Sequence, residues 1–150
     1  MYDFLKFLHV LAAVVWVGGG LALNFLGTRL ATAGTSAEIA GFARQLEWMG
    51  TRIFMPSSLL LLLAGIFMTI DAWSFEDLWI VIGMGGFLYS FINGAFFVGP
   101  LSGRTGKLLA EKGAEDPQVL ANIQRLFVLG RVELAILVIV VWAMTMKPTL

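Results

Sequence analysis

Four long apolar runs, separated by polar stretches, constrain this chain more than any other feature of its sequence. Only three charged residues lie inside the runs. A helix needs about 20 residues to cross the hydrocarbon core of a bilayer, and each run has about that length. Because lipid offers the backbone no hydrogen-bond partners, such segments are predicted to be helices. The sequence therefore predicts an all-α membrane protein, with spans at residues 4–26, 53–70, 78–98 and 126–146.

Composition narrows the class of protein further. Of the 150 residues, 59% are hydrophobic and 13% are charged, an apolar share above the value of about 45–50% that is typical of soluble domains. The ten basic and ten acidic residues balance, so we expect no nucleic-acid partner. The absence of cysteine excludes disulfides and thiolate metal ligands. We expect one domain over residues 1–150, an antiparallel up-down-up-down four-helix bundle embedded in a lipid bilayer.

Basic residues are distributed unevenly among the connections between the runs. Both long connections carry several Lys and Arg. In the short connection between the second and third runs, all charged residues are acidic. The positive-inside bias predicts that both long connections lie in the cytoplasm and both termini outside. Aromatic anchors are then expected at the outer interface, and they are Tyr2, Trp73, Trp79 and Trp142.

Both long connections contain further helical signals. Residues 36–49 form an amphipathic pattern that predicts an extension of the second helix into the cytoplasm, capped by Thr35 or Ser36. Residues 105–111 predict another extension that ends at Gly113, and Asp116-Pro117 predicts the start of the fourth helix. The simpler expectation is that these cytoplasmic extensions lie at the lipid surface. The alternative is that they dock a partner.

Small residues predict where the helices meet. Between helices in lipid there is little hydrophobic driving force, so Gly and Ser mark close contacts. Gly86, Ser90 and Gly94 follow a small-xxx-small spacing in the third run, with Gly83 nearby. We therefore expect this face to pack closely against another helix.

One face of the first run carries the most distinctive chemistry. His9, Trp16, Gly20 and Asn24 recur at helical spacing, so we expect this face to point into the bundle. An imidazole near thioethers is a ligand set for heme iron or cuprous copper. The alternatives are a structural His9, hydrogen-bonded to a carbonyl or water, and methionines that serve packing. The methionines at similar depth on the other runs are Met68, Met84 and Met144.

A second set of polar residues lies in the inner half of the runs. Ionisable groups in the hydrocarbon zone are costly and suggest a function by default. Arg131 and Glu133 are two residues apart and point to different sides, so we expect Glu133 to meet Arg29 or Arg52 from a neighbouring helix. Hydrogen bonding between helices and a site for proton transfer or a polar substrate both remain open. The residues of this set are Asn24, Asn93, Arg131 and Glu133.

The first run also carries a family resemblance. The segment LKFLHVLAAVVWVGG, residues 5–19, resembles the first helix of small four-helix bacterial membrane proteins, among them the copper-resistance D-type and HemJ-type protoporphyrinogen oxidase families. The resemblance implies that His9 ligates heme b, or copper, and that Trp16, Gly18 and Gly19 form a face that accommodates a flat cofactor. The chain has no lysine inside a span to match the intramembrane basic residue of the oxidases, and Arg131 is only a loose substitute. Residues 55–56, 64–65 and 144–148 resemble a branch of predicted integral membrane proteins of unknown function.

Three functions remain as hypotheses. The first is a four-helix protein of the bacterial inner membrane that binds heme b, or copper, through His9 near the outer face for redox or cofactor handling. Met68, Met84 or Met144, or His9 of a second copy in a homodimer, would then supply the second axial ligand. The second is a non-catalytic accessory or assembly subunit of a larger membrane complex. The third is a small transporter that uses Glu133 and Arg131.

Overall fold

The structure is a computed structural model that describes residues 1–149, and every regular element within this range is helical. Three of its four long helices contain a short π-helical segment, named η, between two α-helical parts. Four helices are long and apolar enough to cross a membrane. In chain order the elements are α1 (Tyr2–Ala13), η1 (Val14–Gly18), α2 (Gly19–Ala33), α3 (Ser36–Met49), η2 (Gly50–Phe54), α4 (Met55–Ala72), α5 (Leu78–Ile92), η3 (Asn93–Val98), α6 (Gly99–Lys112) and α7 (Pro117–Met146).

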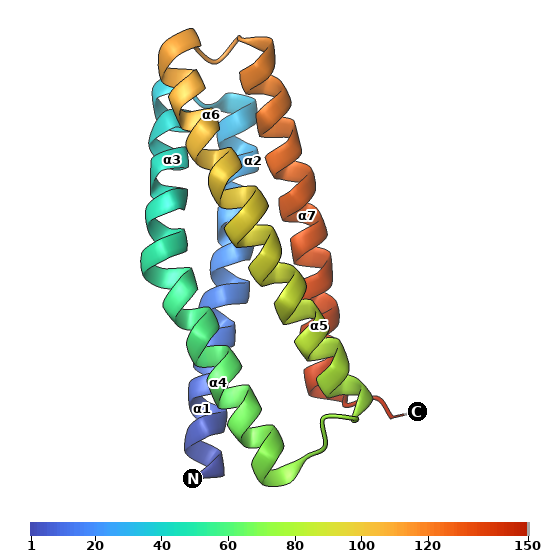
Figure 1. Ribbon diagram of the computed structural model, residues 1–150. Helices are drawn as coiled ribbons and strands as arrows, with labels where there is room; N and C mark the ends of the chain where they lie inside the picture. The colour runs from blue at the N-terminus through green and yellow to red at the C-terminus, as the bar shows by residue number, and fades with distance from the viewer. Residues whose placement is uncertain (150) are drawn as a thin grey trace.

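The four long helices form an antiparallel bundle in which each runs opposite to the next. Figure 1 shows both termini at its lower end, together with the connection between α4 and α5. The connections from α2 to α3 and from α6 to α7 lie at the upper end. The predicted all-α, up-down-up-down membrane bundle is therefore confirmed.

The helix ends follow the expected capping chemistry. Thr35 caps α3 in a reciprocal capping box with Glu38, and Asp116 caps α7 by accepting a hydrogen bond from the Gln118 amide at 2.8 Å. Gly113 follows α6 with φ of +84°, a conformation that favours glycine. These short-range signals place the upper turns of the bundle where the sequence predicted them.

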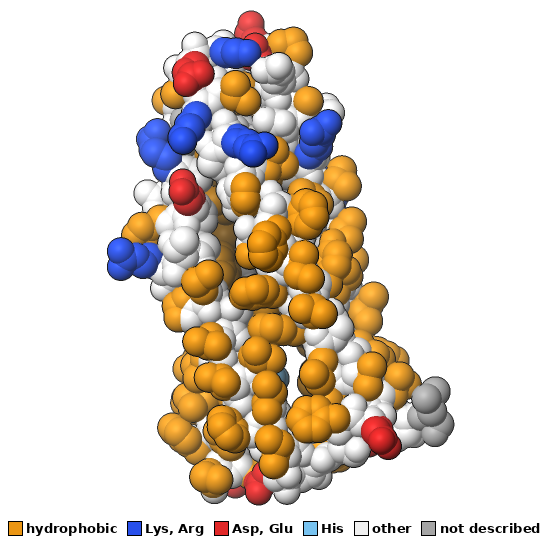
Figure 2. All heavy atoms as spheres, viewed as in Figure 1, with side chains coloured by type: hydrophobic (Ala, Val, Ile, Leu, Met, Phe, Trp, Pro, Cys, Tyr) orange, Lys and Arg blue, Asp and Glu red, His pale blue; other side chains and the backbone are white. Residues whose placement is uncertain are grey.

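The two predicted helical extensions pack against neighbouring helices at the upper end of the bundle. Helix α3 packs against α6, and α6 packs against α7. Their apolar faces bury Ala43, Thr105, Leu109 and Val119, so these faces are not left free for lipid. The extensions therefore pack together and lengthen the bundle, and their place at the lipid surface stays a prediction. On the face shown in Figure 2, the Lys and Arg side chains lie mostly around this upper part, and the coloured side chains of the lower part are mainly hydrophobic.

The contact between α5 and α7 depends on glycine, as the small-residue spacing predicted. A Cβ on Gly86 would overlap the Val140 side chain, and one on Gly83 would overlap the Met144 methyl group. Ser90 is buried on the same helix. Gly94, by contrast, has nothing within 4 Å of its missing Cβ, because its side of η3 is open.

The lower half of the bundle consists of two helix pairs. Helix α1 packs along α4, and α5 packs along α7, with far less contact between α4 and α5. An edge-to-face contact of Trp16 in η1 with Phe87 in α5 joins the pairs, with 5.3 Å between the ring centroids. The candidate site lies in this lower half.

Aromatic side chains also join the segments at the lower rim. The Trp73 indole N–H donates a hydrogen bond to the Tyr2 hydroxyl at 3.0 Å. Trp79 meets Trp73 edge to face, and the Lys147 Nζ lies 3.8 Å from the Trp73 ring centroid. These contacts tie the start of the chain, the α4–α5 connection and the residue after α7 into one rim.

Candidate functional site

His9 lies on α1 and faces α4. Its Nδ1 atom lies 2.9 Å from the backbone carbonyl oxygen of Leu61. A carbonyl only accepts hydrogen bonds, so Nδ1 carries the donated proton. In the neutral ring Nε2 then keeps its lone pair, which is the arrangement found in histidines that bind metals.

A glycine on α4 makes room for this ring. A Cβ on Gly65 would lie 3.1 Å from Cε1 and 3.3 Å from Nδ1 of His9, which is tighter than an ordinary contact. In the apolar lower half of Figure 2 the surface is hollowed between two groups of orange side chains, and the pale blue of histidine shows at its floor. His9, the only histidine of the chain, is thus held against α4 and is partly exposed.

The expected shared face of the first helix is divided among three neighbours. His9 bonds to α4, Trp16 meets α5, and the Asn24 side chain lies on Gly130 of α7, whose Cβ would come within 2.7 Å of Oδ1. These three residues point into the bundle, as predicted, whereas Gly20, the fourth residue of the expected face, has nothing within 4 Å of its missing Cβ. The π-helical turn η1 lies between His9 and Asn24 and changes the helical register along this face.

The two glycines of the expected cofactor face have different surroundings. The Phe54 ring occupies the face of Gly19, where a Cβ would lie 2.8 Å from the ring. Gly18 is exposed and has nothing within 4 Å of its missing Cβ. Of these two glycines, only Gly18 therefore leaves open space where a cofactor could lie.

The three candidate methionines also differ. Met84 is 46% exposed on the outer surface, and the Met144 side chain lies over Gly83 within the α5–α7 contact. Met68 is half-buried on α4, the helix that bonds to His9. Within the described part of the chain, no three His, Asp or Glu side chains gather as they would around a metal ion. Any metal at His9 therefore has to draw on other ligands.

The inner polar residues meet in part. The Asn93 amide donates a hydrogen bond to Glu133 Oε2 at 2.9 Å, which joins η3 to α7. Asn93 is only 4% exposed. The expected pairing of Glu133 with Arg29 or Arg52 is corrected, because both arginines are exposed on the surface and Asn93 is the partner of the carboxylate. Arg131 is also exposed and stands apart from this bond.

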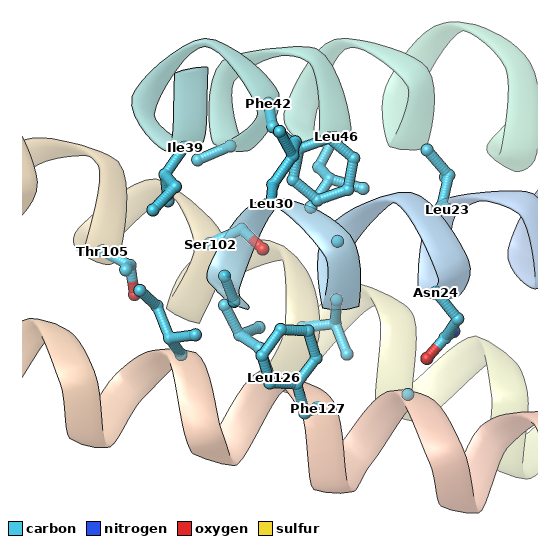
Figure 3. Close-up of a pocket in the computed structure, with 16 residues that line it drawn as sticks. Leu23, Asn24, Leu30, Ile39, Phe42, Leu46, Ser102, Thr105, Leu126 and Phe127 are labelled. Atoms are coloured by element: carbon cyan, nitrogen blue, oxygen red, sulfur yellow. The ribbon is translucent and has the colours of Figure 1, made fainter. Parts of the chain in front are cut away.

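A cavity of about 120 Å³ lies above this polar bond, between α2, α3, α6 and α7. Figure 3 shows Phe42 and Leu46 on one side, Leu126 and Phe127 on the other, and the Ser102 hydroxyl between them. That hydroxyl is buried, and no group among the described residues forms a hydrogen bond with it. Ligand pockets typically measure about 300–1,000 Å³, so the cavity is too small for a flat macrocycle.

Sequence reasoning missed the partners that fix the candidate site. Leu61 contributes a backbone carbonyl, Phe54 and Phe87 contribute apolar rings, and Ser102 is one serine among several. The spacing of His9 predicts which way it faces, but nothing in the sequence identifies a carbonyl 52 residues away as its acceptor. Only Gly65, a small residue in an apolar run, hinted at a close neighbour.

Comparisons with known proteins give a family and no closer relative. A family model described as "Predicted integral membrane protein (DUF2269)" matches residues 3–148. No curated protein and no solved structure matches the chain. The matched family is not the copper-resistance D-type or HemJ-type family, so the finer resemblance remains a hypothesis. The match covers nearly the whole chain and agrees with the four apolar helices; the chain belongs to the DUF2269 family of predicted integral membrane proteins.

Proposed function

We propose that this protein binds heme b through Nε2 of His9 and serves in redox or cofactor handling in the membrane. The hydrogen bond from Nδ1 of His9 to the Leu61 carbonyl carries the proposal. It fixes the ring and raises the basicity of Nε2, as such bonds do for metal-bound imidazoles. When bound, heme would supply one-electron redox chemistry. The chain's own residues orient the ligand and keep water from it with an apolar surround.

The surroundings of His9 fit a flat cofactor better than an all-protein metal cage. The two helix pairs have little contact between α4 and α5, and the lower half is hollowed beside the ring (Figure 2). Trp16 and Phe87 bridge the pairs through an edge-to-face contact. A cuprous ion would need several thioethers close to His9, and two of the three candidate methionines face elsewhere.

The second residue that would hold the heme is Met68 or His9 of a second copy. Met68 lies three residues beyond Gly65, so it shares the face of α4 that meets His9. Met84 faces outward and Met144 is engaged with Gly83, which makes both weaker candidates. In a homodimer, two copies of His9 would ligate one heme and Met68 would be dispensable.

The proposed location is the inner membrane of a bacterium, with both termini outside. Support comes from the segregation of charge along the bundle. Lys and Arg gather at the end that holds the α2–α3 and α6–α7 connections (Figure 2). The opposite end carries Asp71, Glu76 and Asp77 in or beside the α4–α5 connection.

The absorption spectrum of the purified protein tests the function. We expect a Soret band in detergent, either as isolated or after heme addition, and its loss in His9→Ala. Met84→Leu is the matched control and should leave the spectrum unchanged, whereas Met68→Leu should change the bands of the reduced protein if Met68 is the second ligand. Absence of a Soret band in the wild-type protein after heme addition would reject heme binding, and copper analysis of the same sample would test the alternative metal.

Two other functions remain hypotheses. An accessory subunit of a larger complex predicts co-purification with other membrane proteins in mild detergent, and mass analysis would reveal them. A transporter that uses Glu133 and Arg131 as one site is disfavoured, because Glu133 bonds to Asn93 while Arg131 faces outward.

A further inference from the structure

A groove on the outside of the bundle, separate from the His9 region, has the features of a lipid site. It runs between η3 and α6 on one side and α7 on the other, and its volume is about 680 Å³. This volume is within the range of ligand pockets. Its lining residues are Phe96, Phe97, Pro100, Leu101, Arg104, Ala121, Gln124, Arg125, Val128 and Leu129.

The two ends of the groove differ in chemistry. Asn93 meets Glu133 and Gly86 meets Val140. The same antiparallel register, continued upward, places Arg104 of α6 within one turn of Arg125 of α7. It also places Phe96 and Phe97 near the level of Val128. One end is therefore basic and the other is apolar.

The basic end has no acidic side chain of its own. Among the described residues that line the groove there is neither Asp nor Glu, and both arginines are exposed. Guanidinium groups bind phosphate oxygens through paired hydrogen bonds. Two such groups at one end of a groove, with Gln124 beside them, suit a phosphate ester.

The apolar end is open to the surroundings of the helices. Phe96 is 68% exposed, Phe97 55% and Val128 61%. Exposed aromatic and aliphatic side chains on a membrane-spanning helix contact acyl chains. The groove thus has a cationic end that matches the phosphate of a phospholipid and an apolar end that matches its acyl chain.

Arg104 and Arg125 lie just beyond the ends of the apolar runs, at the depth expected for a lipid headgroup. The third apolar run ends at Val98, and Arg104 lies six residues beyond it, or about 9 Å along a helix. Arg125 comes directly before the fourth run. Basic pockets between helices at this level bind anionic headgroups in other membrane proteins.

We propose that this groove binds one anionic phospholipid, with its phosphate between Arg104 and Arg125 and an acyl chain along Phe96, Phe97 and Val128. The proposal is independent of the function of His9. An anionic diester such as phosphatidylglycerol is favoured over phosphatidylcholine, because the choline ammonium would meet the two guanidinium groups.

Native mass spectrometry of the detergent-purified full chain tests the proposal, with phosphatidylglycerol or phosphatidylcholine added in increasing amounts. We expect wild-type protein to retain phosphatidylglycerol preferentially. The variant Arg104→Gln/Arg125→Gln should bind it about 30-fold more weakly, from about fivefold for each basic residue near an anionic lipid. The matched control Arg29→Gln/Arg44→Gln removes the same charge outside the groove and should bind as the wild type does.

Further arms of the experiment separate the possible causes of binding. Arg104→Lys/Arg125→Lys keeps the charge and should recover part of the affinity, which a folding defect would not allow. Glycerol phosphate, which has no acyl chain, should not displace the lipid. Equal loss in both double glutamine variants, equal binding of phosphatidylcholine, or displacement by glycerol phosphate would each overturn the proposal.

Discussion

His9 is held by two features of one turn of α4, the Leu61 carbonyl and the bare face of Gly65. The carbonyl sets which nitrogen carries the proton, and the glycine lets the ring lie close to the helix backbone. Neither feature is a polar side chain. The histidine is therefore positioned almost wholly by backbone, and Nε2 is the ring nitrogen that the bond to Leu61 does not use.

The variant Gly65→Ala tests this positioning. Its Cβ would press on Cε1 and Nδ1 of the ring, so the ring must tilt from its rotamer, at a cost of about 0.5–1.5 kcal/mol. We expect heme affinity to fall about twofold to tenfold, measured by titration of the apoprotein followed at the Soret band. Gly20→Ala is the control, because nothing lies within 4 Å of its missing Cβ. Equal affinities of the two variants would contradict the positioning by Gly65.

Part of the site could be predicted at this scale and part could not. The spacing of His9, Trp16 and Asn24 correctly places all three inside the bundle. The predicted partner of Glu133 was wrong, because the prediction relied on charge complementarity, which favours arginine. In the structure Arg29 and Arg52 are exposed, and Asn93 is the group buried beside the carboxylate. Arginine has a long side chain that reaches water from a helix surface, and asparagine does not.

Among the elements, the α5–α7 contact is the one most dependent on a single residue type. The Val140 side chain fills the space at Gly86. Val140 is β-branched and therefore stiff, so it cannot move aside as a long flexible side chain would. The closeness of these two helices also sets the distance over which Asn93 reaches Glu133.

Neighbouring glycines of α5 provide a matched test of this packing. Gly86→Ala should lower the thermal stability of the purified protein, because overpacking costs about 1–3 kcal/mol and outweighs the gain in helix propensity of about 1 kcal/mol. Gly85→Ala gains the same propensity and meets nothing within 4 Å. We expect its melting temperature to be unchanged or higher. Equal melting temperatures of the two variants would show that α5 and α7 are not packed through Gly86.

Element boundaries were predictable where local chemistry decides them. Thr35, Gly113 and Asp116 end or begin helices as their side chains and backbone require. The π-helical segments η1, η2 and η3 were not predicted, because a π-turn has no composition of its own and arises from tertiary packing. The packing of α3 on α6 was also missed, since an amphipathic face does not reveal whether lipid or another helix will cover it.

At the scale of the whole molecule, charge is sorted along the bundle axis. The lower half is mainly apolar and ends in an aromatic rim, and most of the Lys and Arg lie in the upper half (Figure 2); Lys6 and Lys147 lie toward the lower end. The sequence predicted the four helices and their alternating direction. Each apolar run has the length of a membrane span, and in lipid its backbone hydrogen bonds must be formed within the helix, which leaves few other structures. The orientation in the bilayer is a prediction from the same charge asymmetry.

The absence of cysteine allows that orientation to be measured directly. Glu76→Cys in the α4–α5 connection and Glu115→Cys in the α6–α7 connection are matched exposed substitutions at opposite ends. On spheroplasts, a membrane-impermeant maleimide should label Glu76→Cys, and it should label Glu115→Cys only after lysis. The reverse pattern would place the termini in the cytoplasm and invert the proposed topology.

The most direct test of heme ligation by His9 is the spectrum of His9→Gly with and without added imidazole. If Nε2 of His9 binds the iron, the Soret band of the heme-loaded protein is lost in the variant and returns when millimolar imidazole enters the space that the side chain left. A variant that holds heme with the wild-type spectrum in the absence of imidazole would contradict ligation by His9, and with it the proposed function.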